Sequence, residues 1–334
     1  MIDYLILYRD WGRATGVTVS VNHLLKLMNA NGFSNKVIFY HNDEELLEAI
    51  SCNMTRVIML QAPTFKYDTL IKILDTGRNT VLVVHSTISY LQAEADAFEN
   101  VQKYLQLVYR NFMICNPCQY EVEGFRSYAK TEIIYLPNTF NQVSFNSESD
   151  LNKKIKMKQN NPQKKISIFC DYRPFKNIAT QITACSIASK QLNLELHMFI
   201  EKHENSVYKN IKLLLKNTNL PIVWHDKCGN KELHDILDNM TLGLQVSYSE
   251  TFSYIIFEHM IHGIPTIAST TVPFASIISE FNDAKKIADK IYYITQDIQY
   301  SKYAQKAIQQ SENVRKKNNK DALKALKIIL RKCN

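Results

Sequence analysis

Short apolar runs alternate with amphipathic segments along most of the chain. The runs lack polar alternation, which is typical of strands buried on both faces of a parallel sheet. The segments between them repeat apolar residues at helical spacing. We interpret as strands residues 5–8, 36–40, 57–60, 81–85, 112–115, 132–136, 166–170, 195–200, 222–224, 242–246 and 266–268. Strands that alternate with helices in this way predict an α/β fold with parallel sheets.

The clearest strand–helix–strand unit spans residues 242–269, LGLQVSYSETFSYIIFEHMIHGIPTIAS. An apolar run at 242–246 predicts a buried strand, and the polar turn at 247–250 offers capping side chains to the helix that follows. Gly263 ends this helix. Because a helix that follows a parallel strand presents free N–H groups and its positive dipole end at the sheet edge, this turn is suited to a phosphate.

Two carboxylates flank the start of this helix. Glu250 lies in the turn before it, and Glu258 lies about two turns inside it. A carboxylate accepts hydrogen bonds from paired sugar hydroxyls, as the acidic residue of dinucleotide folds does with a ribose. A central phosphate with a hydroxylated ring on either side describes a nucleotide sugar. The alternative is an ordinary amphipathic helix with solvated glutamates.

The pair Glu250 and Glu258, followed by HGIPTIAS, resembles the E-x7-E motif of retaining glycosyltransferases of the GT-B fold, family 4 type. The resemblance implies that Glu250 lies near the donor sugar and that Glu258 holds the ribose. It also implies that the diphosphate is held by the backbone amides of Thr251, Phe252, Ser253 and Tyr254. The family has Gly-Phe-Gly where this chain has Thr-Phe-Ser, so we expect the positive φ of the glycines to be lost and the diphosphate to approach less closely.

A second basic motif follows the strand at 166–170. The sequence DYRPFKN at residues 171–177 resembles the R-P-x-K-N phosphate clamp of the same family. Arg173 would offer a planar fork and Lys176 a point charge to the donor phosphates. The alternative is a solvated arginine–lysine pair.

The first part of the chain carries two weaker signals. The loop and helix GRATGVTVSVNHLLKLM resemble the first loop and helix of the family, which implies that Gly16 contacts donor phosphate or acceptor. VLVVHS resembles the family segment V-x-H-D, which implies that His85 lies beside the transferred sugar, although Ser86 replaces the aspartate. A histidine at the carboxyl end of a parallel strand points at the ligand crevice. The alternative is a histidine with a structural partner at the strand end.

The resemblance implies two Rossmann-like domains that face a cleft, and the sequence suggests their boundaries. We expect an N-terminal acceptor-side domain at residues 1–141 and a nucleotide-sugar-binding domain at 165–299. Residues 142–164 are polar, lysine-rich and without apolar period, so we expect a linker. Residues 300–334 predict two basic helices that pack back on the first domain.

The charge of +8 is concentrated in the second half, in six lysines between Lys153 and Lys165 and in the C-terminal tail. These lysines form either solvated faces or a weak peripheral contact of the linker or tail with an anionic membrane or glycan. Tyr300 and Tyr303 are the only aromatic residues from position 300 onward, and we predict no nucleic-acid partner. No apolar run is long enough for a membrane span.

Seven scattered cysteines favour a protein of the reducing cytoplasm. Any contact of its lysines with a membrane would then be with the inner face. Cys115 and Cys118 form a lone CxxC without a second ligand pair, so we predict no metal site. The chain also lacks the Asp-x-Asp cluster of metal-dependent glycosyltransferases.

The resemblance therefore implies a metal-independent, retaining hexosyltransferase. The expected donor is a UDP- or GDP-linked sugar, with no further cofactor. The expected acceptor is a glycan, a lipid-linked glycan or another glycoconjugate. Two alternatives use the same cleft: a nucleotide-sugar epimerase or phosphorylase, and a degenerate non-catalytic partner of another glycosyltransferase.

Overall fold

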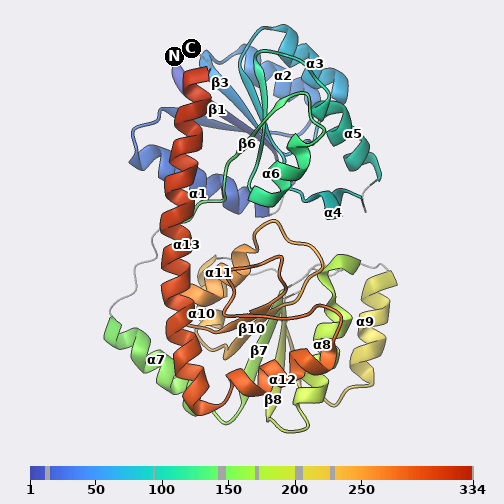
Figure 1. The fold of residues 1–334 in the computed structure, drawn as a ribbon, viewed down its shortest axis with the longest axis vertical. Coiled ribbons are helices and arrows are strands. Elements are labelled where there is room, and N and C mark those ends of the chain that lie inside the picture. Colours follow the sequence, from blue (N-terminus) through green and yellow to red (C-terminus); the bar gives the residue numbers. More distant parts are fainter. Residues whose placement is uncertain are drawn as a thin grey trace. The chain divides into compact units, whose positions relative to one another are not determined.

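The protein consists of two compact units, each built on one six-stranded sheet. This computed structural model describes residues 1–11, 16–92, 95–141, 148–169, 173–199, 206–225 and 230–332. The first unit comprises Met1–Gln142 and Arg315–Asn334, and the second comprises Val143–Val314. Every strand pair in both sheets is parallel. The predicted α/β fold with two Rossmann-like units is confirmed (Figure 1).

The sheet of the first unit has the strand order β2-β1-β3-β4-β5-β6. Its strands are β1 (Ile2–Arg9), β2 (Asn35–Tyr40), β3 (Thr55–Gln61), β4 (Thr80–Val83), β5 (Phe112–Asn116) and β6 (Glu132–Tyr135). Its helices are α1 (Gly16–Ala30), α2 (Asp43–Ser51), α3 (Tyr67–Asp75), α4 (Ile88–Leu91), α5 (Ala95–Leu105) and α6 (Gln119–Arg126). One sheet face packs on α2, α3, α5 and α6, and the other packs on α1 and the end of the C-terminal helix (Figure 1). Both faces are therefore apolar, which explains the continuous apolar runs.

The sheet of the second unit has the strand order β12-β11-β10-β7-β8-β9. Its strands are β7 (Lys164–Phe169), β8 (Leu194–Phe199), β9 (Ile222–His225), β10 (Leu242–Gln245), β11 (Thr266–Ala268) and β12 (Ile277–Ile278). Its helices are α7 (Glu148–Asn160), α8 (Ile178–Ala188), α9 (Ser206–Lys216), α10 (Asn230–Leu237), α11 (Tyr254–Ile261) and α12 (Ala284–Ile294), with a 3-10 turn η1 (Pro174–Lys176). The order reverses between β7 and β10, so the carboxyl ends of these two strands flank the topological switch point.

Two sequence-based predictions about the connecting segments are wrong. Part of the expected linker forms α7, because Leu151 and Ile155, one helical turn apart, are buried against Tyr300 and Ala304. Two buried apolar side chains among lysines are too few to give a recognisable helical period in the sequence. The expected pair of C-terminal helices is one continuous helix, α13 (Asp297–Lys332).

Helix α13 contributes to the cores of both units. Its early residues pack on α7 in the second unit, and its last turns join the core of the first unit. There the hydroxyl of Tyr4 donates a 2.6 Å hydrogen bond to the carbonyl of Leu326. Across the described ranges, no helix is both long and apolar enough to cross a membrane.

Candidate functional site

The second unit brings two predicted motifs to the same edge of its sheet. Strand β7 leads to η1, with Arg173 at its N-cap and Lys176 at its end, and β10 leads through the loop that holds Glu250 to α11, which holds Glu258. Because β7 and β10 are neighbouring parallel strands, their carboxyl ends lie together at the switch point. Motifs about 75 residues apart in sequence therefore meet in this unit.

Helix α11 lies very close to this sheet because β10 contains a glycine. A Cβ atom at Gly243 would lie 2.6 Å from the ring of His259. Nδ1 of His259 lies 2.6 Å from the carbonyl of Ile255, and its Nε2 lies 2.5 Å from the hydroxyl of Ser167 on β7. Burial lowers the pKa of His259 to about 4, so the imidazole is neutral. The small residues of the strands and this ring together fix where α11 starts.

The loop before α11 corrects one expectation from the sequence. Ser253 is the N-cap residue and adopts φ 70° and ψ 77°, the left-handed conformation. The positive φ expected to vanish with the family's glycines is therefore present at a serine, at a cost of roughly 1–2 kcal/mol. The side chain of Ser253 makes no cap hydrogen bond to α11. The buried Oγ of Ser253 has no hydrogen-bond partner among the described residues.

Lys176 and Glu250 form an ion pair at this edge. Nζ of Lys176 lies 2.7 Å from Oε1 of Glu250, and the two side chains are only 14% and 9% exposed. Nε2 of Gln245 donates a second 2.7 Å hydrogen bond to the same oxygen. No local pattern in the sequence predicts this contact between Lys176, expected to bind phosphate, and Glu250, expected to lie near the sugar.

The remaining residues of the two loops surround this ion pair. Arg173 is the N-cap residue of η1, and its guanidinium lies 4.8 Å from the ring centre of Phe175. The ring of Phe252 is buried and stacks on Phe274 at 4.6 Å. Thr251 and Tyr254 are half-buried, and the ring of Tyr254 lies 5.4 Å from that of Phe252. Phe252 thus anchors the loop through its side chain.

Glu258 is half-buried in α11, and the described residues provide it with neither a hydrogen bond nor an ion pair. Burial raises the pKa of its carboxyl group from 4.5 to about 7. A surface glutamate would show no such shift, so the alternative of a solvated helix face does not describe Glu258.

His85 follows β4 in the first unit, near the carboxyl edge of that sheet. Its Nε2 lies 2.8 Å from Oε1 of Gln61, the last residue of β3. Burial lowers the pKa of His85 to about 4, so the ring is neutral near pH 7. The adjacent Ala62 adopts φ 72°, a strained conformation for alanine.

Gly16, the other predicted residue of the first unit, begins α1. A Cβ atom at this position would meet no described atom within 4 Å, so packing alone does not require a glycine. The neighbouring Gly12 lies outside the described residues.

Three residues of the second-unit site were missed at the sequence level: Gln245, Asn177 and Gln181. Asn177 belongs to the R-P-x-K-N pattern, which was the one available signal. It adopts φ 54° and ψ 38°, the left-handed conformation. The glutamines carry no local signature, because a buried amide is indistinguishable from a surface amide in the sequence.

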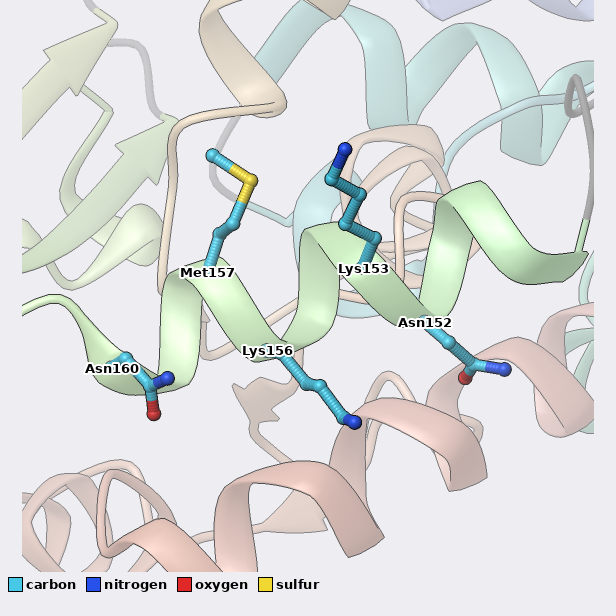
Figure 2. A pocket seen from close by; sticks show the side chains of 5 residues that line it. All are labelled: Asn152, Lys153, Lys156, Met157 and Asn160. Carbon is cyan, nitrogen blue, oxygen red and sulfur yellow. The ribbon is translucent and has the colours of Figure 1, made fainter.

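A shallow pocket lies elsewhere, along α7. It is lined by Asn152, Lys153, Lys156, Met157 and Asn160. Figure 2 shows Lys153 and Met157 projecting to one side of the helix and the other three side chains to the other. None of the predicted donor-site residues lines this pocket.

The described part of the chain contains no group of three or more His, Cys, Asp or Glu side chains that could hold a metal ion. Its four cysteines, Cys52, Cys115, Cys118 and Cys185, are free thiols. Burial raises the pKa of both thiols of the CxxC pair, which makes them poor nucleophiles.

No protein-family model matches the chain, and no curated protein matches it. Several solved structures share its fold. The N-terminal domain of Candida albicans trehalose-6-phosphate phosphatase superposes with a TM-score of 0.72 at 12% identity, covering 99% of this chain and 97% of that one. Sucrose-phosphate synthase from Thermosynechococcus elongatus gives 0.68 at 14%, covering 98% and 96%. Anabaena HepE in complex with UDP and glucose gives 0.69 at 13%, covering 98% and 100%. At these identities the likeness shows the fold alone, that of GT-B proteins.

Proposed function

We propose that the protein is a glycosyltransferase whose second unit binds a nucleoside diphosphate sugar. The observation that carries this proposal is the Lys176–Glu250 pair beside the start of α11, at the switch point of a parallel sheet. Open α/β sheets bind nucleotides at such points. A cation, a helix N-terminus and two carboxylates at one edge match the phosphates and hydroxylated rings of this donor.

The phosphate part of the proposal assigns the diphosphate to Arg173, Lys176 and the amides that begin α11. These groups would stabilise the negative charge that develops on the leaving diphosphate. The orphan hydroxyl of Ser253 is a further donor for a phosphate oxygen. Because these groups supply the positive charge, we propose that transfer needs no metal ion.

Glu258 is proposed to hold the ribose. A half-buried carboxylate whose pKa is raised to about 7 is poorly solvated, so it gains most from two hydroxyl donors. The resemblance noted in the sequence points to the same role.

Glu250 and His85 are proposed to flank the transferred sugar. In the proposed reaction the bond from the anomeric carbon to the diphosphate oxygen breaks, and its electron pair leaves with the nucleoside diphosphate. The acceptor hydroxyl oxygen bonds to the same face of the carbon, which retains its configuration, and its proton passes to the leaving phosphate. A neutral His85 can exchange hydrogen bonds with sugar hydroxyls but carries no charge to the site. The acceptor is proposed to be a glycan or glycoconjugate.

UDP is the first donor nucleotide to test. HepE was crystallised with UDP and with UDP-glucose, and another fold neighbour is a UDP-forming trehalose-phosphate synthase from Burkholderia xenovorans. These ligands belong to those proteins, and they support the proposal only by analogy of fold. GDP-linked donors are the second choice.

The test is a thermal-shift series with UDP, GDP, ADP, CMP and their sugars, without metal. A ligand that binds only the folded protein raises its Tm. A shift with one nucleotide supports the donor site, and NMR of a glycosylated product would then report the anomeric configuration. Turnover without acceptor would indicate an epimerase or phosphorylase. The absence of any shift would contradict the proposal. The remaining alternative would then be a non-catalytic partner of another glycosyltransferase.

The assigned roles separate binding from turnover. Glu258→Ala should weaken nucleotide binding, whereas Glu250→Ala and His85→Ala should mainly lower kcat. Unchanged nucleotide affinity in Glu258→Ala would contradict the ribose role. The matched control is Glu44→Ala, on the exposed first turn of α2 in the other unit, which should change neither quantity.

We also propose a weak contact of α7 with the anionic inner face of a membrane, where lipid-linked acceptors are found. Lys153 and Lys156 are exposed and make no ion pair with a described residue, and Lys153 projects to the same side of α7 as Met157, which is 66% exposed (Figure 2). The test is co-sedimentation with phosphatidylcholine vesicles with and without phosphatidylserine. Binding should require phosphatidylserine, weaken with salt, and be lost in Lys153→Glu/Lys156→Glu. Equal binding of the double variant would overturn this contact.

A further inference from the structure

The two motifs of the candidate donor site are joined by buried side-chain amides. Among the described residues, the pairing of β7 with β10 extends as far as Ile168 and Leu244. Val246, the first residue after β10, is fully buried together with its backbone N–H and C=O. Such groups need partners inside the protein.

Gln181 of α8 supplies the first of these partners. Its side chain is fully buried. Its Oε1 accepts a 3.0 Å hydrogen bond from the N–H of Val246, and its Nε2 donates a 2.8 Å hydrogen bond to the carbonyl of Lys176. A second, longer bond of 3.4 Å runs from Nε2 to the carbonyl of Asn177. One amide group thus bridges the clamp segment, residues 173–177, and Val246, the first residue after β10.

Asn177 supplies the second partner. Its Nδ2 donates a 3.0 Å hydrogen bond to the carbonyl of Val246 and another to the carbonyl of Phe281. The left-handed conformation of Asn177 ends η1 and turns its side chain into the protein. A backbone bond of 2.8 Å from the N–H of Tyr248 to the carbonyl of Phe175 completes the connection.

These bonds link the segment after β7 to the segment after β10, mostly by means of side chains. Because these bonds connect the clamp segment 173–177 with the turn 246–250, we expect the two segments to behave as one rigid body. Lys176 and Glu250 project from the two halves of this body and meet at 2.7 Å. Moving the clamp segment by one hydrogen-bond length would separate the cation from the start of α11.

We propose that Gln181 is a positioning residue that sets the spacing between the phosphate-binding cations and the loop that carries Glu250. The expected effect of Gln181 on phosphate binding rests on the proposed donor site. The hydrogen bonds of Gln181 to the two segments do not depend on that proposal. Gln181 itself would touch no ligand, and its effect on binding would pass through Lys176 and Val246.

The experiment compares Gln181→Leu, which removes the amide at similar volume, with Thr183→Val on the half of α8 that faces solvent. The hydroxyl of Thr183 bonds only to its own helix, at the carbonyl of Ala179. Gln181→Asn, with a side chain too short to span both halves, is the second variant and carries the test if Gln181→Leu does not fold. Two quantities are measured: amide hydrogen exchange, and the Kd of UDP and of uridine.

We expect the amides of Val246 and Tyr248 to exchange at least about tenfold faster in Gln181→Leu, because their hydrogen bonds are lost or loosened. UDP affinity should fall by about tenfold, while the affinity for uridine, which has no phosphates, should stay within about twofold. Thr183→Val should change neither. A residue that only fills the core would lower Tm and leave the ratio of UDP to uridine affinity unchanged.

The two readouts separate this inference from the proposed function. If wild-type protein binds no nucleotide, the donor site is refuted, and hydrogen exchange still decides whether Gln181 couples the two segments. If exchange at Val246 and Tyr248 is unchanged, the coupling is refuted. If exchange accelerates but both ligands lose affinity equally, Gln181 does not position the phosphate-binding groups and the inference fails.

Discussion

Glu258 should make the protein less stable as pH rises, and replacing it with glutamine should remove this effect. Burial raises the pKa of its carboxyl group from 4.5 to about 7 in the folded protein. The folded state therefore holds this proton more tightly than the unfolded state does. The stabilising contribution of the protonated group is complete below pH 4.5 and is lost as pH rises through 7.

The magnitude follows from the two pKa values. A pKa difference between 4.5 and about 7 corresponds to about 3 kcal/mol in the free energy of unfolding. Glu258→Gln is neutral at every pH and has almost the same shape. We expect the variant to be more stable than wild type by up to about 3 kcal/mol at pH 8.5, and nearly equal to it at pH 4.5. Each kcal/mol should raise Tm by roughly 2–4 °C.

The assay is urea and thermal unfolding of both proteins between pH 4.5 and 8.5, followed by titration with UDP at pH 8.5. Taking the difference between the proteins cancels all other titrating groups. The control is Glu280→Gln: the Lys290 ammonium holds the pKa of Glu280 down to about 2, so this variant should gain no stability at high pH. The same amide that stabilises the protein at position 258 should bind UDP about tenfold more weakly, because it offers one acceptor in place of two.

Two results would refute this reasoning. A stability difference that is the same at pH 4.5 and 8.5 would mean that Glu258 is not poorly solvated. A gain in stability with unchanged UDP affinity would mean that the carboxylate is buried for some reason other than ribose binding.

Gly243→Ala should destabilise the protein by about 1–3 kcal/mol in thermal unfolding, because its Cβ would lie 2.6 Å from the ring of His259, whereas Gly16→Ala should cost little. Lys176→Met should raise the Kd of UDP at least about tenfold and leave that of uridine unchanged, since a buried cation beside the phosphates is lost. Stability in urea should fall as pH drops from 6.5 towards 4, because the unfolded chain binds more protons than buried histidines with a pKa near 4. These histidines are His23, His85, His259 and His262.

Each of these three predictions has a clear contrary outcome. If Gly243→Ala lowered the stability as little as Gly16→Ala does, α11 would be able to shift away from the sheet at little cost. An equal loss of UDP and uridine affinity in Lys176→Met would indicate unfolding of the site rather than loss of phosphate binding. Identical urea midpoints at pH 7.5 and pH 5 would mean that the histidines are solvated enough to protonate in the folded protein.

The sequence by itself determined the order of strands and helices and the motifs at their junctions. Strands buried on both faces are continuous apolar runs, and a helix leaves its period in the sequence whenever one face is apolar. For this reason α11, which contains Glu258, and the strand–loop–helix junction that contains Arg173 and Lys176 were located correctly from local signals. Helix α7 was not, because only Leu151 and Ile155 carry its apolar face.

The tertiary structure alone decided how these motifs meet. The pairs Lys176–Glu250 and Gln181–Val246 are separated by 74 and 65 residues, and the contacts between them depend on the strand order β10-β7-β8 rather than on any local pattern. The left-handed Ser253 and the raised pKa of Glu258 have the same origin. Backbone strain and desolvation are imposed by surrounding atoms that are distant in sequence, so no spacing of residues along the chain encodes them.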